Sequence, residues 1–415
     1  MSVAVICTGT ELLKGSCCNT DLRFAGEKLT AASLPPVLEI CVPDHAGKIV
    51  SALAFALQNA DIIIISGGLG PTSDDITLET AARFFGAELE EVPELKEKVA
   101  AHWALRHSGH CPKFQYKQAK IIKGGKYFDN PVGTASGIGF ESNYRGEKKH
   151  IYLLPGPPAE FEAVFSGGVL PDILELQAEK LHTTGFLVCA TGESSVARTV
   201  EPLLKEFAGV EIAYTATPAG TKLFLSSKDP ATLAQAVDAA RNAIGINALI
   251  PGATSLPEAL LKKLASAGLT MGCAESCTGG MIADMLVSIP GSSAVFQGGI
   301  VSYANQVKNN ILHVPEEILA EHGAVSSECA SAMVHGACKA LNTHCAVSTT
   351  GVAGPDGGTP EKPVGLVYIA ATVNNLTAVK KLQLHGNRQT IRERAANAAL
   401  FLLWQLLDAP ESEQC

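Results

Sequence analysis

Four consecutive isoleucines at residues 62–65 place the strongest constraint on how this chain folds. They stand between Asp61 and Ser66, and a short run that is wholly apolar is typical of a strand buried on both faces of a parallel sheet. A glycine-rich turn and a helical pattern follow directly, at residues 66–75 and 76–85. Because parallel strands are joined through helices, the run predicts an α/β fold with this strand inside its sheet.

The same alternation of strand and helix patterns organises the rest of the chain. Its 415 residues are too many for one ordinary core. We expect an α/β domain over residues 1–170, a small α+β module over residues 171–250 and a second α/β domain over residues 251–415. Strands are predicted at residues 3–7, 37–42, 62–65, 151–154, 184–190, 211–215, 222–226, 299–302 and 346–349. Helices are predicted at residues 19–29, 46–57, 76–85, 94–106, 194–207, 230–243, 257–267 and 389–407.

Composition and charge exclude several classes of protein. Hydrophobic residues make up 47% of the chain and charged residues 18%, which is typical of a globular protein. A net charge of −9 without a basic cluster argues against nucleic acid as a partner. We expect a cytoplasmic protein with no membrane partner, because no apolar segment approaches the roughly 20 residues that span a bilayer and no basic stretch precedes the first apolar run. The twelve cysteines include no C-x-x-C pair, so reduced thiols are expected.

The glycine-rich turn at residues 66–75 is a candidate phosphate site. Its glycines allow the backbone to approach a phosphate closely, and the N-terminus of the following helix favours anions. Asp74 and Asp75 repel a phosphate unless a metal ion lies between them. Alternatively, one of these aspartates only caps the helix. The turn fits neither the P-loop nor the dinucleotide fingerprint, which argues against an ATPase and a dehydrogenase.

Three further loops, at residues 9–13, 130–137 and 155–160, are rich in glycine, threonine or proline, and two of them directly follow predicted strands. Since ligands of open α/β sheets bind at the carboxyl ends of strands, we expect these loops to join the glycine-rich turn in one nucleotide site. Its candidate residues are Thr10, Glu11, Gly67, Gly68, Gly70, Thr72, Asn130, Gly133, Thr134, Gly156 and Glu160, with Asp74 and Asp75 as metal ligands.

A serine in the last domain stands where a predicted strand gives way to a predicted helix. The segment at residues 274–280 reads AESCTGG, and a helix N-terminus there would direct backbone N–H groups at an oxyanion beside Ser276. The alternative is that Ser276 only caps the helix. The segment matches neither G-x-S-x-G nor S-x-x-K, so the α/β-hydrolase and β-lactamase templates do not apply.

Two further segments favour a serine hydrolase. Lys308 could serve as a general base if burial removed its proton, with Tyr303 relaying the proton or orienting the serine. Asn305 is predicted to cap the helix that carries Lys308. Arg388, just before the last helix, suits a phosphate. The alternatives are that Tyr303 and Lys308 are ordinary surface residues and that Arg388 is solvated.

The loops of the first domain resemble a known family. The segments GTELL, GGLGPTSDD, NPVGTASG and PGPPAE are similar to the competence/damage-inducible protein A (CinA) family, and the order of modules is similar along nearly the whole chain. The resemblance implies that the first domain has the molybdopterin-binding-protein fold. It also implies that this domain hydrolyses the pyrophosphate of ADP-ribose, using a divalent metal (Mg²⁺ or Co²⁺) and potassium. At residues 114–119 this chain reads FQYKQA, where the family usually has a run like Asn-Asn-Arg-Lys-Gln-Ala.

The last domain also resembles this family. AESCTGG, the pair Tyr303 and Lys308, TTGVAGPDGG and GNR are similar to its nicotinamide-mononucleotide deamidase domain, which implies hydrolysis of the amide to the acid without a cofactor. By matching position, Ser276 would be the nucleophile, Lys308 the base and Tyr303 its assistant. The residues expected to bind substrate are Thr278, Gly279, Gly280, Thr350, Gly351, Gly354 and Arg388.

The leading hypothesis is therefore a hydrolase of pyridine-nucleotide breakdown products with two sites. Two alternatives stay open: a deamidase whose first domain only binds nucleotide, and a molybdopterin-binding protein. The middle module resembles the family's KH-like domain, but Gly192–Ser195 lacks the basic loop of a nucleic-acid clamp. We expect nucleotide-like small molecules as substrates and a homodimer as the assembly.

Overall fold

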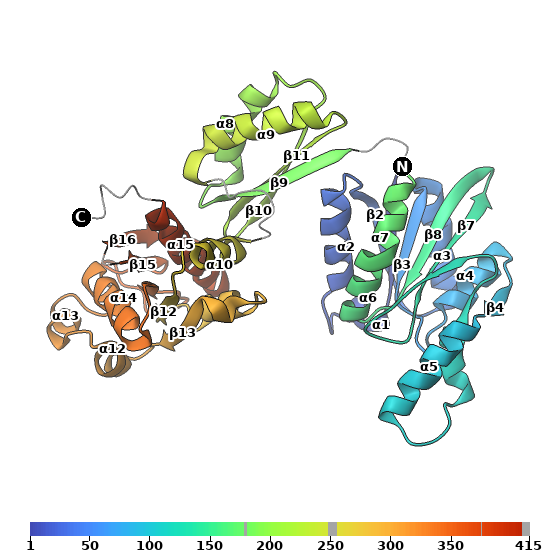
Figure 1. Ribbon diagram of the computed structural model, residues 1–415, viewed down its shortest axis with the longest axis horizontal. Coiled ribbons are helices and arrows are strands. Elements are labelled where there is room, and N and C mark those ends of the chain that lie inside the picture. The colour runs from blue at the N-terminus through green and yellow to red at the C-terminus, as the bar shows by residue number, and fades with distance from the viewer. Residues whose placement is uncertain (178–180, 248–254, 375, 409–415) are drawn as a thin grey trace. The chain divides into compact units, whose positions relative to one another are not determined.

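The computed structural model describes residues 1–177, 181–247, 255–374 and 376–408, and the chain divides into two compact units, Met1–Thr183 and Thr184–Cys415 (Figure 1). The first unit runs past the predicted boundary at residue 170, because the helix Leu170–Glu175 packs against the sheet of this unit. The predicted boundary between residues 250 and 251 lies outside the described residues.

A six-stranded mixed sheet forms the first unit, with the order β2-β1-β3-β8-β7-β6. The isoleucine strand β3 lies between β1 and β8 and is parallel to both, which confirms its predicted interior place. The antiparallel strands β7 and β6 were not predicted. The strands of the unit, including a separate two-stranded ribbon of β4 and β5, are β1 Val3–Thr8, β2 Pro36–Val42, β3 Ile62–Ser66, β4 Leu89–Glu91, β5 Lys120–Ile122, β6 Lys126–Phe128, β7 Gly137–Tyr144 and β8 Glu147–Leu154.

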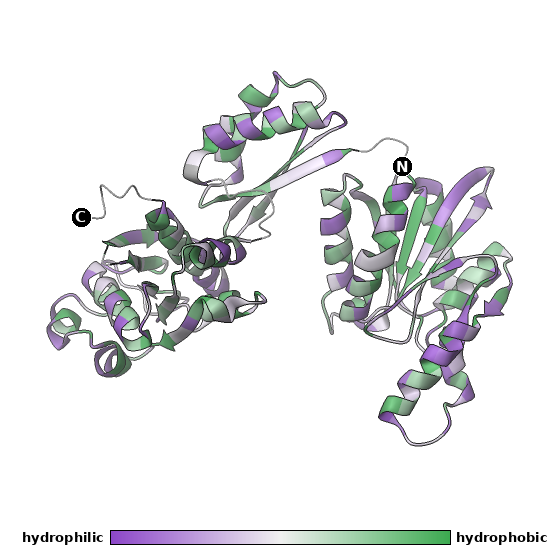
Figure 2. Cartoon of the chain, viewed as in Figure 1, coloured by the Kyte–Doolittle hydropathy of each residue, from purple (hydrophilic) through white to green (hydrophobic). Residues whose placement is uncertain are grey.

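Helices cover both faces of this sheet, so residues 62–65 of β3 and residues 151–154 of β8 are apolar or aromatic and buried, as the hydropathy colouring shows for β3 (Figure 2). Successive residues of β3 alternate between two cores, with Ile62 and Ile64 on one face and Ile63 and Ile65 on the other. The helices and helical turns of the unit are α1 Thr10–Leu13, α2 Thr20–Ala31, α3 Ala46–Asn59, α4 Thr77–Phe85, α5 Pro93–Arg106, η1 Lys113–Ala119, α6 Pro158–Val164, η2 Phe165–Val169 and α7 Leu170–Glu175.

The second unit contains two sheets. A three-stranded sheet, β10-β11-β9, packs against two helices and forms the module that the sequence predicts as α+β. Its elements are β9 His182–Cys189, α8 Glu193–Leu204, β10 Glu211–Thr217, β11 Gly220–Ser227, α9 Pro230–Ile244 and the turn η3 Gly245–Asn247.

The other sheet of the second unit has the order β13-β12-β14-β15-β16, in which β13, β12 and β14 are parallel, β15 is antiparallel to β14, and β16 is antiparallel to β15. Its helices pack on both faces, with α10, α11 and α15 in one core and α12 and α14 in the other. The elements are α10 Leu256–Ser266, β12 Met271–Glu275, α11 Met281–Val287, η4 Ser292–Ala294, β13 Phe296–Val301, α12 Asn305–Leu312, α13 Glu316–Glu321, α14 Ser327–Leu341, β14 Cys345–Gly351, β15 Leu366–Val373, β16 Leu376–Gln383 and α15 Arg388–Leu407.

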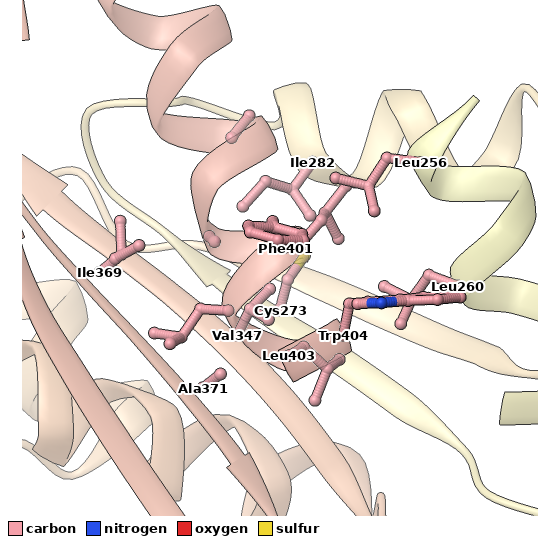
Figure 3. Packing of buried hydrophobic residues seen from close by; sticks show 14 of the residues in the cluster. Leu256, Leu260, Cys273, Ile282, Val347, Ile369, Ala371, Phe401, Leu403 and Trp404 are labelled. Atoms are coloured by element: carbon pink, nitrogen blue, oxygen red, sulfur yellow. The ribbon is translucent and has the colours of Figure 1, made fainter. Parts of the chain in front are cut away.

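The larger core of this sheet centres on α15, whose Phe401 and Trp404 pack against α10 and the strands (Figure 3). Residues 400–404 of α15 are all buried, so this helix is enclosed on every side at that point. Every cysteine among the described residues is a free thiol. No helix in the described part of the chain is long and apolar enough to cross a membrane.

Candidate functional site

Ser276 is the first residue after the carboxyl end of β12. Its N–H donates to the carbonyl of Thr349 at 3.0 Å, which fixes it to the neighbouring strand β14. The following helix α11 starts only at Met281 and is capped by Gly280. The prediction that Ser276 opens a helix is therefore wrong, and so is the alternative that it serves as the cap. Ser276 instead stands on a turn between strand and helix, with its side chain at the wall of a cavity.

The side chain of Glu275 bonds backbone N–H groups at the N-terminus of α11. The sequence predicts that these groups stabilise an oxyanion beside Ser276. The Glu275 carboxylate is fully buried, and it accepts hydrogen bonds from the backbone N–H groups of Gly280 at 3.0 Å, Ile282 at 3.1 Å and Ala283 at 3.0 Å. Three N–H groups at the N-terminus of α11 are thus already engaged. The expectation that they stabilise an oxyanion at Ser276 is wrong, and their observed role is to hold the turn that carries the serine.

We expect Glu275→Gln to lower the stability of the second unit. The amide keeps one acceptor oxygen but turns an NH₂ group toward backbone donors, which should cost about 2 kcal/mol or more. The midpoint of thermal unfolding should fall by several degrees. Glu258→Gln, on the first turn of α10, is the matched control. An unchanged midpoint for Glu275→Gln would contradict the role of this carboxylate.

Lys308 lies in α12, the helix that follows the neighbouring strand β13, and its side chain contacts Ser276. Its Nζ lies 3.1 Å from Ser276 Oγ, 2.7 Å from the carbonyl oxygen of Ser302 and 3.4 Å from that of Tyr303. The residue is only 1% exposed, and burial lowers the pKa of its amine. Carbonyl oxygens can only accept, so a neutral amine donates its two hydrogens to them and turns its lone pair to the serine hydroxyl. The geometry is that of a general base beside a nucleophile.

The local structure around Lys308 differs from the sequence predictions in two respects. The cap of α12 is Ala304, and Asn305 is the first helical residue, so the predicted Asn305 cap is wrong. The alternative of Lys308 as a surface residue is also wrong, because it is buried. Tyr303 is 66% exposed and contacts Lys308 through its backbone carbonyl. Its role as a proton relay stays a prediction.

The cavity beside Ser276 has a volume of about 260 Å³. Thr350, Gly351, Gly354 and Arg388 line it together with Ser276, Tyr303 and Lys308. Arg388 is the first residue of α15 and donates to the carbonyl of Gly354 at 2.6 Å, which holds the guanidinium at the wall. The Thr350 hydroxyl donates to the carbonyl of Ala324 at 2.6 Å.

Three predicted substrate residues lie outside this lining. Thr278 is fully buried, with its hydroxyl 2.7 Å from that of Thr349, and its carbonyl accepts from Arg392 at 2.7 Å. Gly279 and Gly280 form the turn behind it. Cys277 does line the cavity, but burial raises its pKa to about 11, so its thiol stays protonated at neutral pH. Ser276, whose hydroxyl lies 3.1 Å from the Lys308 amine, is the better-placed nucleophile.

A second cavity, of about 610 Å³, lies at the carboxyl ends of the strands in the first unit. The structure brings the four predicted loops together around it. The predicted residues in its lining are Glu11, Gly67, Gly68, Gly70, Asp74, Asp75, Thr134, Gly156 and Glu160. Thr10, Thr72, Asn130 and Gly133 are not in the lining.

The glycine-rich turn depends on glycine at two positions. Gly67 and Gly68 have φ angles of 99° and 69°, and a Cβ atom would lie 2.4 Å from the Thr8 carbonyl oxygen and 2.2 Å from Thr77 Oγ1, respectively. The helix α4 that follows is capped by Ile76, without a side-chain bond. Neither Asp74 nor Asp75 caps it, so that alternative is wrong.

Asp74 and Asp75 converge on Thr72. The Thr72 hydroxyl lies within hydrogen-bond distance of both carboxylates, and its N–H donates to Asp75 Oδ2 at 2.9 Å. Carboxylate and carbonyl oxygens are the ligands that Mg²⁺ prefers, and this ion needs only one or two carboxylates when phosphate and water supply the rest. Among the described residues no three Asp, Glu, His or Cys side chains converge on a metal position. Two carboxylates are enough for Mg²⁺ where other oxygens complete its shell, so the chemistry of Asp74 and Asp75 fits this ion.

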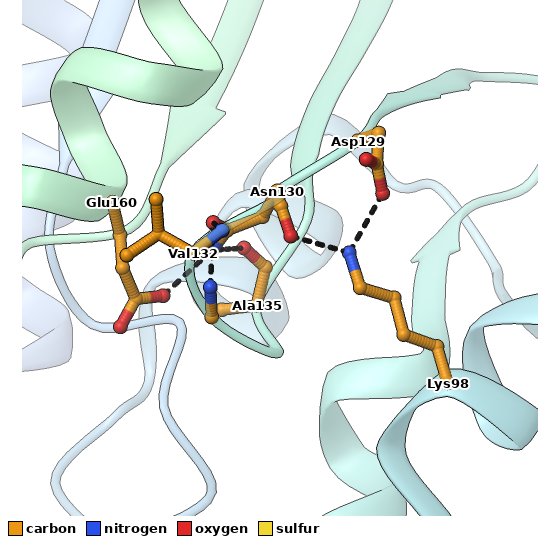
Figure 4. Close-up of polar contacts among 7 residues, drawn as sticks. Lys98, Asp129, Asn130, Val132, Ala135 and Glu160 are labelled. Carbon is orange, nitrogen blue, oxygen red and sulfur yellow. Dashed lines mark hydrogen bonds and ion pairs between the residues drawn. The ribbon is translucent and has the colours of Figure 1, made fainter. Parts of the chain in front are cut away.

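Asn130 does not line the cavity, but its side chain holds two residues that do, Glu160 and Ala135 (Figure 4). It is fully buried, its amide donates to Glu160 Oε2 at 2.6 Å and to the carbonyl of Ala135 at 2.8 Å, and its Oδ1 accepts from the N–H of Gly133 at 2.8 Å. Thr10 has a similar supporting place, because its N–H and hydroxyl both donate to Asp44, at 2.9 and 3.1 Å.

The side chains of this cavity that the sequence analysis missed include Asp21, Asp44 and Gln118. Gln118 accepts from the Thr134 hydroxyl at 2.9 Å, and its neighbour Lys117 donates to the carbonyl of Asp75. The segment at residues 114–119 thus holds the glycine-rich turn, and its resemblance to the family's Lys-Gln-Ala was the available signal. Asp21 and Asp44 lie at ordinary helix or loop positions that carry no sequence signal.

The fold and the two cavities define a class: a two-unit α/β protein with a strand-end pocket in one unit and a buried serine–lysine pair in the other. Family comparison agrees with this division. Residues 4–175 match the model described as "Probable molybdopterin binding domain", and residues 253–407 match "CinA C-terminal domain".

The chain belongs to the CinA family. It is 36% identical to a "CinA-like protein" of Dictyoglomus thermophilum, over 98% of this chain and 100% of the relative. It is 37% identical to a "CinA-like protein" of Kosmotoga olearia, over 96% and 97% of the two chains. Among solved structures, the competence/damage inducible protein CihA from Agrobacterium tumefaciens is 40% identical over 37% of this chain and 94% of its own, with a TM-score of 0.36.

Proposed function

We propose that the second unit is an amidohydrolase that converts nicotinamide mononucleotide and water to nicotinic acid mononucleotide and ammonia. The observation that carries the proposal is the contact of 3.1 Å between the Lys308 amine and the Ser276 hydroxyl. Among the described residues, no carboxylate contacts Lys308 and holds its proton. The resemblance of the site segments to the family's deamidase domain supplies the substrate. Arg388 at the cavity wall suits the phosphate of a mononucleotide.

The residues suggest a two-step reaction. Lys308 accepts the hydroxyl proton as Ser276 Oγ attacks the carboxamide carbon, and it returns that proton to the departing nitrogen, so ammonia leaves and a serine ester remains. Water then attacks the ester with Lys308 again as the base. The acid is released and the serine hydroxyl is restored. Each step uses the same short contact, and none requires a metal.

For the first unit we propose metal-dependent cleavage of ADP-ribose at its pyrophosphate. Six carboxylates line its cavity, and none of the described lining residues is a lysine or arginine. A bare phosphate would be repelled there. Mg²⁺ or Co²⁺ held with Asp74 and Asp75, assisted by potassium, would neutralise the charge that develops on the phosphates. Gly67 and Gly68 would let the backbone approach them.

Molybdopterin binding is the second candidate for the first unit, on the basis of the match over residues 4–175. A deamidase whose first unit only binds nucleotide is the third. The acidic lining is compatible with all three when a cation is present, so the reaction itself has to decide among them.

The test is one assay of the purified chain on two substrates, with and without EDTA. We expect ammonia from nicotinamide mononucleotide under both conditions, and AMP from ADP-ribose only when Mg²⁺ or Co²⁺ is present. Asp75→Asn should lower AMP release by about 10²-fold or more and leave ammonia release unchanged. Absence of ammonia would overturn the deamidase. Absence of AMP release, with nucleotide still bound, would leave a binding module in the first unit.

A further inference from the structure

One acidic side chain of the first cavity differs from the others in its surroundings. Asp21, in the first turn of α2, lines the cavity and is only 6% exposed. The Ser66 hydroxyl donates to its Oδ2. Its Oδ1 is buried and has no hydrogen-bond partner among the described residues. A buried carboxylate oxygen without a partner destabilises the fold, so this position calls for a ligand or a proton.

The other carboxylates of the cavity already have partners or face solvent. Asp44 accepts from Thr10, Glu160 accepts from Asn130, and Asp74 and Asp75 accept from Thr72. Glu11 is exposed. Asp21 Oδ1 therefore differs from the other carboxylate oxygens of this cavity, because it is buried and has no partner among the described residues.

Asp21 is also distinct from the proposed metal corner. The charged group that acts on Asp21 is Glu162, whereas the one that acts on Asp74 is Lys117. Burial raises the pKa of Asp21 to about 6, so it is mostly ionised at pH 7 and is then a strong hydrogen-bond acceptor. An ionised acceptor repels phosphate and attracts hydroxyl donors. The hydroxyls of a ribose are such donors, and carboxylates bind them in other α/β nucleotide sites.

We propose that Asp21 binds a ribose hydroxyl of the nucleotide in the first cavity and so makes this site selective for ribonucleotides. The inference rests on the proposed nucleotide binding of the first unit and adds the side chain that distinguishes ribose from a sugar without hydroxyls. Phosphates would lie at the Gly67–Gly70 turn with the cation, and the sugar at Asp21 and Ser66.

The test measures binding, with AMP and 2′,3′-dideoxy-AMP as probes in the presence of Mg²⁺. We expect calorimetry to show that the full chain binds AMP about tenfold more tightly than the dideoxy compound, because an unpaired buried carboxylate penalises the analogue that lacks the hydroxyls. In Asp21→Ala and Asp21→Asn this preference should shrink to about twofold or less. Glu162→Gln, which removes the neighbouring exposed carboxylate, should keep the preference.

Three outcomes would overturn the proposal: no AMP binding by the full chain, equal affinity for the two probes, or a preference that survives in Asp21→Ala. The last outcome would also result if AMP bound in the second unit, because Asp21 would then not contact it. AMP has neither a pyrophosphate nor a carboxamide to hydrolyse, so its binding does not depend on either proposed activity. If ADP-ribose is not cleaved but the Asp21-dependent preference is present, the proposed reaction fails and the ribose site stands. Circular dichroism checks folding, and Asp21→Asn keeps the side-chain shape if the alanine variant unfolds.

Discussion

Ser276→Ala is expected to reduce ammonia release from nicotinamide mononucleotide by about 10³-fold or more, with little change in substrate affinity. The substitution removes the attacking oxygen, whereas Arg388 and the cavity wall stay in place. The fold should tolerate the change, because Lys308 keeps the carbonyls of Ser302 and Tyr303 as acceptors. The measurement is kcat for ammonia release, beside the affinity for the mononucleotide.

Ser288→Ala is the control, since this serine is exposed at the end of α11 and its hydroxyl donates to the carbonyl of Asp284, away from the cavity. It should retain the full rate. If Ser276→Ala retained the rate too, water would have to attack the amide directly and the serine would be a structural residue. Mass spectrometry of the quenched wild-type reaction gives an independent check, because a serine ester adds the mass of the acyl group.

Much of the scaffold could be predicted from local patterns. The isoleucine run at residues 62–65 is the strand β3, and the loops after the parallel strands meet at one edge because such strands end on the same side. Strand β16, Leu376–Gln383, was missed because it is a half-exposed edge strand with two lysines and little alternation.

The resemblance implies that Ser276 and Lys308 act together, but local patterns could not predict their contact, because it depends on pairing across 32 residues. β12 and β13 are parallel with Glu275 opposite Val301, so both strands end together, and Ser302 N–H donates to the Glu275 carbonyl at 2.7 Å. This register brings the start of α12 to the serine. The late start of α11 has a similar cause, since the buried Glu275 carboxylate holds N–H groups five to eight residues away. The sequence pattern alone does not show that Glu275 points inward.

Lys308→Met and Lys308→Arg should each lower kcat by about 10²–10⁴-fold, the range typical of a lost general base. Methionine has no lone pair that can take the proton, and arginine stays charged. In the wild-type chain kcat/KM should rise with pH as Lys308 loses its proton and level off above its pKa, which burial lowers from the ordinary lysine value. Lys339→Met, at an exposed position of α14, is the matched control and should leave the rate and its pH profile unchanged.

The lowered pKa of Lys308 also fixes the sign of its effect on stability. Between its pKa in the folded chain and the ordinary lysine value, the unfolded chain binds the extra proton, so the free energy of unfolding rises with pH across this window. Below the folded pKa the buried amine is charged and destabilises the fold. Lys308→Met should therefore be at least as stable as the wild type at pH 7 and lose this part of the pH dependence. A variant that is inactive and also much less stable would mean that Lys308 supports the fold, and the loss of rate would then say nothing about a base. An inactive variant of full stability leaves proton transfer as the function of this side chain.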